Sequence, residues 1–325
     1  MRIRPTRRLL LGAVAPLALV PLVACGQASG SESGQQPGLG GCGTSAHGSA
    51  DAHEKEFRAL EKKFDAHPGV YAIDTRDGQE ITHRADERFA YGSTFKALQA
   101  GAILAQVLRD GREVRRGAEA DGMDKVVHYG QDAILPNSPV TEKHVADGMS
   151  LRELCDAVVA YSDNTAANLL FDQLGGRRGS TRVLKQLGDH TTSMDRYEQE
   201  LGSAVPGDPR DTSTPRAFAE DLRAFAVEDG EKAALAPNDR EQLNDWMSGS
   251  RTGDALIRAG VPKDWKVEDK SGQVKYGTRN DIAVVRPPGR APIVVSVMSH
   301  GDTQDAEPHD ELVAEAGLVV ADGLK

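Results

Sequence analysis

The sequence lacks the features that identify metalloproteins, nucleic-acid-binding proteins and disulfide-stabilised domains. Its nine histidines are spread singly along the 325 residues, without the clustered ligands that a zinc or iron site needs, so we expect no metal and no cofactor. The formal net charge of −10 repels nucleic acid phosphates and argues against a nucleic-acid partner. The three cysteines are too few and too differently placed for a disulfide framework, and we predict no structural disulfide.

A long hydrophobic run is also missing. The apolar stretch over residues 9–24 is broken by two prolines and is too short for a comfortable transmembrane helix. It follows an arginine-rich start and ends at Cys25 in the stretch LVAC, which resembles a bacterial lipobox; an ordinary signal peptide cut nearby is the alternative. We therefore expect residues 1–25 to be a signal peptide, and Cys25 to anchor the exported protein by lipid at the outer face of the cell membrane. The paired Arg7 and Arg8 also resemble a twin-arginine export signal.

The remaining chain divides by composition and periodicity. Residues 26–52 are rich in Gly, Ser and Gln, cannot bury apolar area, and are predicted to form a flexible tether. Residues 53–325 are predicted to form one catalytic domain. Strand signals lie in residues 53–92 and 250–325, whereas helical patterns fill residues 93–249. This order predicts an α/β fold: an antiparallel sheet built from the N- and C-terminal segments and flanked by helices, with an all-α middle subdomain. We expect a monomer, because no exposed apolar stripe calls for a partner.

Individual elements follow from the period of the apolar residues. The turn Asp77-Gly78 predicts a hairpin between residues 70–74 and 80–83. Residues 111–125 are charged and weakly patterned, as in a surface loop. Cys155 lies in an apolar helical pattern, which predicts a buried thiol. The other predicted helices cover residues 54–64, 94–108, 151–160, 165–173, 181–187, 215–225, 240–247 and 310–321, and the other predicted strands cover residues 265–269, 282–286 and 293–298.

The first chemical motif opens the apolar helix that begins near Thr94. A serine hydroxyl is a poor nucleophile until a base takes its proton, and positions i and i+3 share a helix face, so Lys96 points toward Ser93. The free N–H groups at a helix N-terminus suit an oxyanion. Alone the motif is weak, because a serine N-cap followed by a surface lysine has the same spacing.

Two further motifs strengthen this interpretation. The stretch SDN at residues 162–164 lies between two helical patterns, and the stretch KSG at residues 270–272 closes a strand. Each has a local alternative, a helix cap and a strand-end turn. The three motifs in this order, with Thr in place of Ser in the third, are grouped in class A β-lactamases and penicillin-binding proteins.

Residues 90–300 resemble a class A β-lactamase, within the serine β-lactamase and penicillin-binding protein superfamily, in an actinobacterial-type lipoprotein form. The stretches 138–144 and 162–170 carry the likeness beyond the motifs, and residues 195–212 resemble the family's Ω-loop. In that loop Glu198 corresponds to the glutamate that activates the deacylating water, and Arg196 and Asp211 correspond to the ion pair at its neck.

The resemblance implies the catalytic roles. Ser93 attacks the lactam carbonyl, and either Lys96 or Glu198 through water takes its proton. Ser162, with Lys270 nearby, relays a proton to the leaving nitrogen.

The resemblance also implies the substrate contacts. The backbone N–H groups of Ser93 and Gln273 form the oxyanion hole. Asn164 holds the substrate's side-chain amide, while Ser271 and Arg279 bind its carboxylate. The substrate-binding set is therefore Asn164, Lys270, Ser271, Gly272, Gln273 and Arg279.

Four positions depart from the family pattern. Gln199 replaces a proline that usually follows a cis peptide bond, and Gly202 replaces an asparagine that helps to hold the hydrolytic water. Asn137 stands in place of an aromatic residue at the site entrance. Val274 replaces a small residue, although Gly92 is itself small and leaves room for it. These changes bear on substrate range and turnover.

The leading hypothesis is hydrolysis of β-lactams through a serine acyl-enzyme, which confers antibiotic resistance. A D-alanyl-D-alanine peptidase shares the three motifs but lacks the deacylating glutamate, so Glu198 argues against it. A non-catalytic lipoprotein that binds β-lactams or peptidoglycan fragments stays open because of Gln199 and Gly202.

Overall fold

A computed structural model describes residues 45–114 and 122–325, all of which lie in one compact unit. The predicted lipidation site Cys25, Cys42, the signal peptide and the tether up to residue 44 fall outside the described residues. Within the described ranges, no helix has the length and apolar character that a membrane crossing requires.

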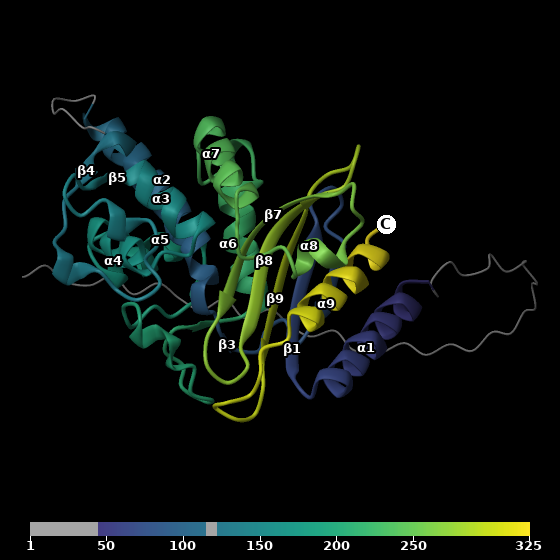
Figure 1. Cartoon of the computed structure of the whole chain (residues 1–325). Coiled ribbons are helices and arrows are strands. Elements are labelled where there is room, and N and C mark those ends of the chain that lie inside the picture. The colour runs from purple at the N-terminus through teal and green to yellow at the C-terminus, as the bar shows by residue number, and fades with distance from the viewer. Residues whose placement is uncertain (1–44, 115–121) are drawn as a thin grey trace, which may run out of the picture. The chain divides into compact units, whose positions relative to one another are not determined.

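The centre of the domain is a five-stranded antiparallel sheet with strand order β2-β1-β9-β8-β7 (Figure 1). Two strands come from the N-terminal segment and three from the C-terminal segment, as the sequence predicted. The first two form the expected hairpin, in which Gly78 has a φ of 77°, a left-handed conformation that favours glycine. The strands are β1 (His67–Asp74), β2 (Glu80–His83), β7 (Lys266–Gln273), β8 (Arg279–Arg286) and β9 (Ile293–His300).

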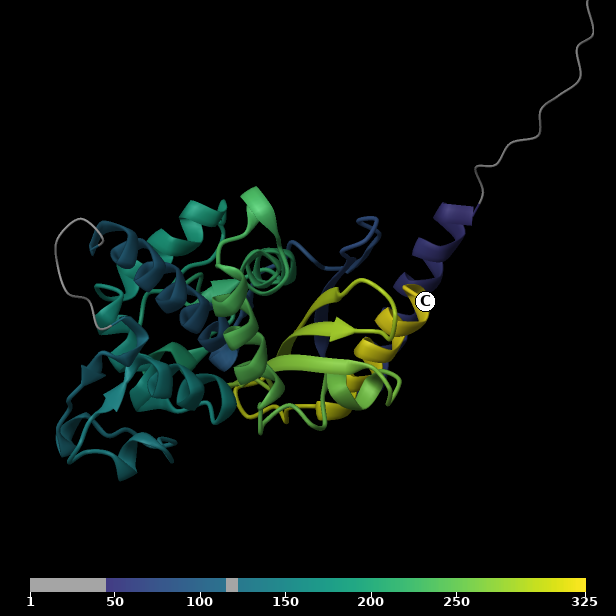
Figure 2. The same cartoon turned by 90° about the horizontal axis from the view of Figure 1, so that it is seen from above.

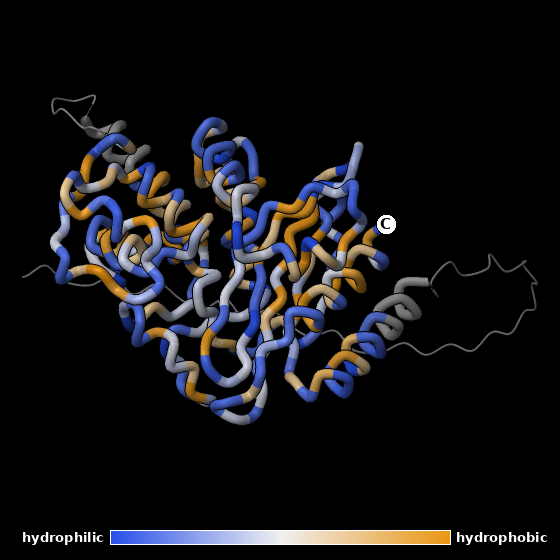
Figure 3. The backbone as a smooth tube through the Cα atoms, viewed as in Figure 1, coloured by the Kyte–Doolittle hydropathy of each residue, from blue (hydrophilic) through white to orange (hydrophobic). Residues whose placement is uncertain are grey.

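Helices cover both faces of this sheet (Figures 1 and 2). One face carries α1 (Ser45–Phe64), α8 (Ile257–Gly260) and α9 (Asp310–Gly323), and the other carries α6 (Pro215–Ala226) and α7 (Pro237–Ser248). Successive residues of a strand point to opposite faces, so the apolar residues 70–73 of β1 alternate between the two cores. Figure 3 shows the apolar residues concentrated along the strands and the helices that face them.

The helical subdomain surrounds α2 (Phe95–Val114), which starts next to the sheet. Its neighbours are α3 (Leu151–Ala160), α4 (Asn164–Gln173) and α5 (Arg177–Leu187). Gly101 lets α2 approach α6, because a Cβ there would lie 2.7 Å from Cγ of Phe225. Cys155 is fully buried in α3 as a free thiol, and burial raises its pKa. The all-α middle subdomain and its α/β neighbour thus match the predicted fold.

Several boundaries differ from the predictions. α1 begins at Ser45, inside the segment predicted as tether, where several alanines favour a helix. α2 reaches Val114 and so enters the predicted surface loop. β1 begins at His67, three residues before the predicted strand over residues 70–74. Two pairs of two-residue strands were not predicted, since so short an element has no period: β3 (Phe89–Ala90) with β6 (Thr212–Ser213), and β4 (Val126–Val127) with β5 (Met149–Ser150).

Candidate active site

Ser93 lies in a short 3-10 helix, Gly92–Thr94, that leads directly into α2. Gly92 has a φ of 53°, which favours glycine, and the Thr94 hydroxyl donates to Tyr91 O at 2.6 Å. These features fix the turn. Ser93 is half-buried, and among the described residues its hydroxyl has no hydrogen-bond partner.

Lys96 is fully buried and is the centre of the polar cluster. Its Nζ donates to Ser162 O at 2.9 Å and to Asn164 Oδ1 at 2.7 Å, and it lies 3.0 Å from Glu198 Oε1. Burial lowers the pKa of Lys96, and the Glu198 carboxylate opposes that shift. A lysine with a lowered pKa is suited to take a proton from a hydroxyl.

Ser162 projects from the loop between α3 and α4 with a φ of 58°. The loop is held by Asp163, which accepts from Ala166 N at 2.9 Å and from Thr141 Oγ1 at 2.9 Å. Lys270 on β7 is fully buried and donates to Ser162 Oγ at 3.3 Å. Burial, and then the charge of Lys96, lowers the pKa of Lys270 to about 7. Two amines therefore surround one serine hydroxyl.

Glu198 reaches this cluster from the Ω-loop (residues 195–212), and its backbone is held by Asn168 on α4. The Glu198 N–H donates to Asn168 Oδ1 at 2.9 Å, and Asn168 Nδ2 donates to Glu198 O at 3.0 Å. The Glu198–Gln199 peptide bond is cis. Sequence reasoning did not single out Asn168, although it lies in the stretch 162–170 that resembled the family.

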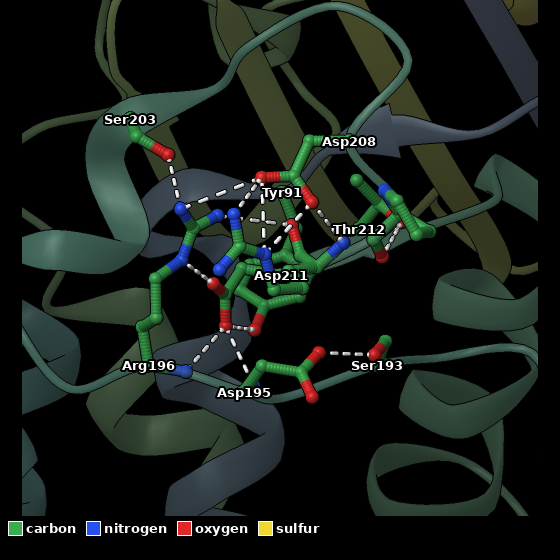
Figure 4. A network of polar contacts seen from close by, with 10 residues as sticks. Tyr91, Ser193, Asp195, Arg196, Ser203, Asp208, Asp211 and Thr212 are labelled. Carbon is green, nitrogen blue, oxygen red and sulfur yellow. Dashed lines mark hydrogen bonds and ion pairs between the residues drawn. The ribbon is translucent and has the colours of Figure 1, made fainter.

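The neck of the Ω-loop is a network around Asp211 (Figure 4). Asp211 pairs with the Arg196 guanidinium, as the sequence predicted, and accepts from the Arg196 N–H at 3.0 Å. The Tyr91 hydroxyl, two residues before Ser93, donates to the same carboxylate at 3.2 Å. The network thus connects the base of the Ω-loop to the turn that carries Ser93.

The end of β7 runs alongside that turn. A Cβ built on Gly272 would lie 2.8 Å from Tyr91 O and 3.0 Å from Ser93 N, so only a glycine allows this approach. The next residue, Gln273, is exposed. The structure thus brings the backbone of Ser93 next to the end of the strand that carries Gln273.

Two other predicted substrate contacts have partners of their own in the structure. Ser271 donates to Thr252 Oγ1 at 2.7 Å, and Arg279 pairs with Asp310 at the start of α9. Ser271 does not share the face of Lys270, because successive strand residues alternate.

Two of the four departures, Val274 and Gly202, are neighbours, and Val274 also lies beside Gly92. Cγ1 of Val274 lies 3.4 Å from where a Cβ added to Gly92 would stand. It lies equally far, 3.4 Å, from where a Cβ added to Gly202 would stand. A third departure, Asn137, has a φ of 60°, and its Nδ2 donates to Ser162 O at 3.2 Å. Val274 thus occupies space that the two glycines leave free.

A hydroxyl with buried amines and a carboxylate nearby can perform acyl transfer, which is the chemistry of a serine hydrolase. Among residues 45–114 and 122–325, no group of three or more His, Cys, Asp or Glu side chains could hold a metal ion.

Comparisons with known proteins identify the family. Residues 52–324 match the model of the β-lactamase enzyme family. The chain is 50% identical to a β-lactamase of Bacillus subtilis over 271 residues, covering 83% of this chain and 84% of the relative. It is 51% identical to a β-lactamase of Amycolatopsis lactamdurans, covering 84% and 85%. The crystal structure of a class A β-lactamase from Clostridium kluyveri superposes with a TM-score of 0.78 at 42% identity, covering 84% of this chain and 99% of that one. The chain belongs to the β-lactamase enzyme family, as a class A serine enzyme that hydrolyses β-lactams.

Proposed function

We propose that Ser93 opens the β-lactam ring and carries the acyl group, and that Lys96 or Glu198 through water takes its proton. The observation that carries the proposal is the contact of Lys96 with Ser162, Asn164 and Glu198 in one buried cluster. Ser162, in hydrogen-bond contact with Lys270, relays a proton to the ring nitrogen. The C–N bond of the lactam breaks, and the nitrogen leaves as an amine.

Deacylation is assigned to Glu198. Its carboxylate acts as the general base for a water that attacks the ester on Ser93. Asn168 supports this role by holding both backbone polar groups of Glu198.

Substrate binding is assigned to the residues along β7 and its neighbours. The N–H groups of Ser93 and Gln273 form the oxyanion hole, which the close approach at Gly272 supports. Asn164 holds the substrate's side-chain amide. Ser271 and Arg279 bind the carboxylate, with Lys270 contributing positive charge.

Intact-mass spectrometry after brief exposure to benzylpenicillin tests these roles. Ser93→Ala is expected to form no adduct. Glu198→Ala is expected to react once and stall with the opened drug attached, because loss of a general base slows deacylation by about two to four orders of magnitude. Wild type shows mostly free enzyme. Glu200→Ala is the matched control, since Glu200 is an exposed glutamate of the same loop.

Each other result contradicts a defined part of the proposal. Turnover by Glu198→Ala at the wild-type rate removes Glu198 from deacylation. A long-lived adduct in wild type indicates a penicillin-binding peptidase. Unmodified wild type together with intact benzylpenicillin indicates a binding protein without catalysis.

We further propose a domain order of signal peptide (residues 1–25), tether (residues 26–52, the last part in α1) and catalytic domain (residues 53–325). The apolar run that ends at Cys25 supports export and lipid anchoring of a monomer at the outer face of the membrane. Cys25→Ala is expected to release the protein from the membrane fraction. A variant that stays bound, or a wild type that carries no lipid, contradicts the anchor.

A further inference from the structure

The two segments that enter and leave the Ω-loop are joined by a series of contacts that continues away from its neck. Beyond the Arg196–Asp211 ion pair, the paired segments approach each other through hydroxyl, backbone and carboxyl groups. From the loop outward, the contacts are Ser193 N to Thr212 O at 3.0 Å, Thr192 Oγ1 with Ser213 Oγ at 2.6 Å, and the carboxyl groups of Asp189 and Asp221. Asp189 follows α5, and Asp221 lies in α6.

The last contact lacks a hydrogen donor. Asp189 Oδ1 accepts from Thr191 N at 2.6 Å and Thr192 N at 3.0 Å, but the Oδ2 atoms of Asp189 and Asp221 are both buried without a donor. Asp221 is only 2% exposed. Two ionised carboxylates cannot hydrogen-bond to each other, because each only accepts. The two side chains nevertheless line the same cavity, and, beyond the effect of burial, Asp189 raises the pKa of Asp221 both by its charge and by a side-chain hydrogen bond.

The surrounding cations do not neutralise the pair. Arg216 pairs with Glu80 and Asp86, and Arg223 pairs with Glu220 and Glu228. Among the described residues, no salt bridge reaches either Asp189 or Asp221. The charged groups that line the same cavity are Asp86, His190, Arg216, Glu220, Arg223, Glu228 and Lys232.

We propose that Asp189 and Asp221 hold one proton between their Oδ2 atoms, and that this proton-bridged pair fastens the base of the Ω-loop to α6. One proton supplies the missing donor for both atoms at once. Asp221 carries it, because Asp189 is already stabilised as an anion by two backbone N–H groups. A metal ion fits less well, since no third His, Cys, Asp or Glu among the described residues completes a metal site.

Electrostatics support this assignment. Burial, and then the neighbouring Asp189 charge, raises the pKa of Asp221 well above its ordinary value. The folded pKa therefore lies above the unfolded value of about 3.9. A group of this kind contributes its full stability below the unfolded pKa, and the contribution is lost as pH rises through the folded pKa.

Asp221→Asn tests the proposal, because its amide donates to Asp189 at every pH. In denaturant unfolding, the free energies of unfolding of wild type and Asp221→Asn should change in parallel with pH below the unfolded pKa of Asp221. Between the two pKa values, the unfolding constant of wild type should rise relative to the variant by up to about tenfold per pH unit, the limit for one proton. Ionisations that both proteins share cancel in the ratio of their unfolding constants. A ratio independent of pH overturns the proposal.

Infrared spectroscopy supplies a readout that a merely structural role would not change. At neutral pH, the difference spectrum between wild type and Asp221→Asn should contain the carbonyl band of one protonated carboxyl group. If Asp221→Asn does not fold, Asp189→Asn takes its place: its oxygen keeps the two backbone bonds and its amide donates to Asp221, so the band should again be lost. Asp221→Ala, without a donor, should be less stable than Asp221→Asn at all pH values. A difference spectrum without this band contradicts the shared proton.

Discussion

The side chain of Val274 fills the space beside Gly202, with its Cγ1 only 3.4 Å from where a Cβ of that glycine would stand. Gly202 belongs to the Ω-loop, four residues after Glu198, and Val274 follows the end of β7. The same methyl group also lies beside Gly92, next to Ser93. One side chain thus separates the loop that carries Glu198 from the turn that carries Ser93.

Val274→Ala should therefore loosen the Ω-loop. Val274 is half-buried, so the loss of its methyl groups should lower the free energy of unfolding by about 1 kcal/mol, less than for a fully buried side chain. Denaturant unfolding measures this change. Acyl-enzyme should also accumulate on mixing with penicillin, because the loop carries the deacylating base.

Two variants control for this effect. Val205→Ala removes an exposed valine of the same loop and should leave stability nearly unchanged. Gly202→Ala places its methyl group in ordinary contact with Val274, and in the double variant it should restore part of what Val274→Ala loses. Strictly additive effects would show that the two residues are not coupled.

Asn168→Ala should slow turnover by acting through Glu198. Removing both hydrogen bonds to the Glu198 backbone costs about 1–3 kcal/mol, which corresponds to roughly a tenfold to hundredfold lower kcat if deacylation limits the rate. Pre-steady-state kinetics should show normal acylation. Asn244→Ala is the control, because Asn244 holds only Ala226 O on α6 and affects stability alone. If Asn168→Ala slowed acylation and deacylation equally, Asn168 would not act through Glu198.

Periodicity predicted the sheet and the helical subdomain because it is a local signal, whereas the ion pair of Arg196 with Asp211 was implied by the resemblance to the family. The resemblance indicated that Gly92 leaves room for Val274, but not that Val274 also lies beside Gly202, which depends on three segments meeting in space. The Asp189–Asp221 contact was missed for the same reason. Asn168 lay within a stretch that resembled the family, yet its hold on Glu198 crosses from α4 to the Ω-loop, and no spacing in the chain indicates that contact.

Arg279→Ala should weaken the capture of penicillins by about 1.5–3 kcal/mol in kcat/KM, the range for a charge-assisted hydrogen bond. Arg279→Lys should restore only part, since lysine lacks the planar fork. Because Asp310 competes for the guanidinium, Asp310→Asn should not weaken capture. An unchanged kcat/KM in Arg279→Ala would remove Arg279 from substrate binding.

Lys270 should give the enzyme an alkaline limb in kcat/KM near neutral pH. With a pKa of about 7, its amine is charged below that pH and neutral above it, so attraction of the substrate carboxylate declines as pH rises. Because kcat/KM reports ionisations of the free enzyme, its pH profile measures this directly. Lys270→Arg should shift the limb to higher pH, since arginine stays protonated.

Lys275→Arg, at an exposed position just beyond β7, should leave the pH profile of kcat/KM unchanged. A substrate whose carboxylate is esterified should show no such limb with wild type, which keeps the test decisive if arginine does not fit the buried site. The same alkaline limb with the ester as with the free acid would show that Lys270 does not act on the carboxylate.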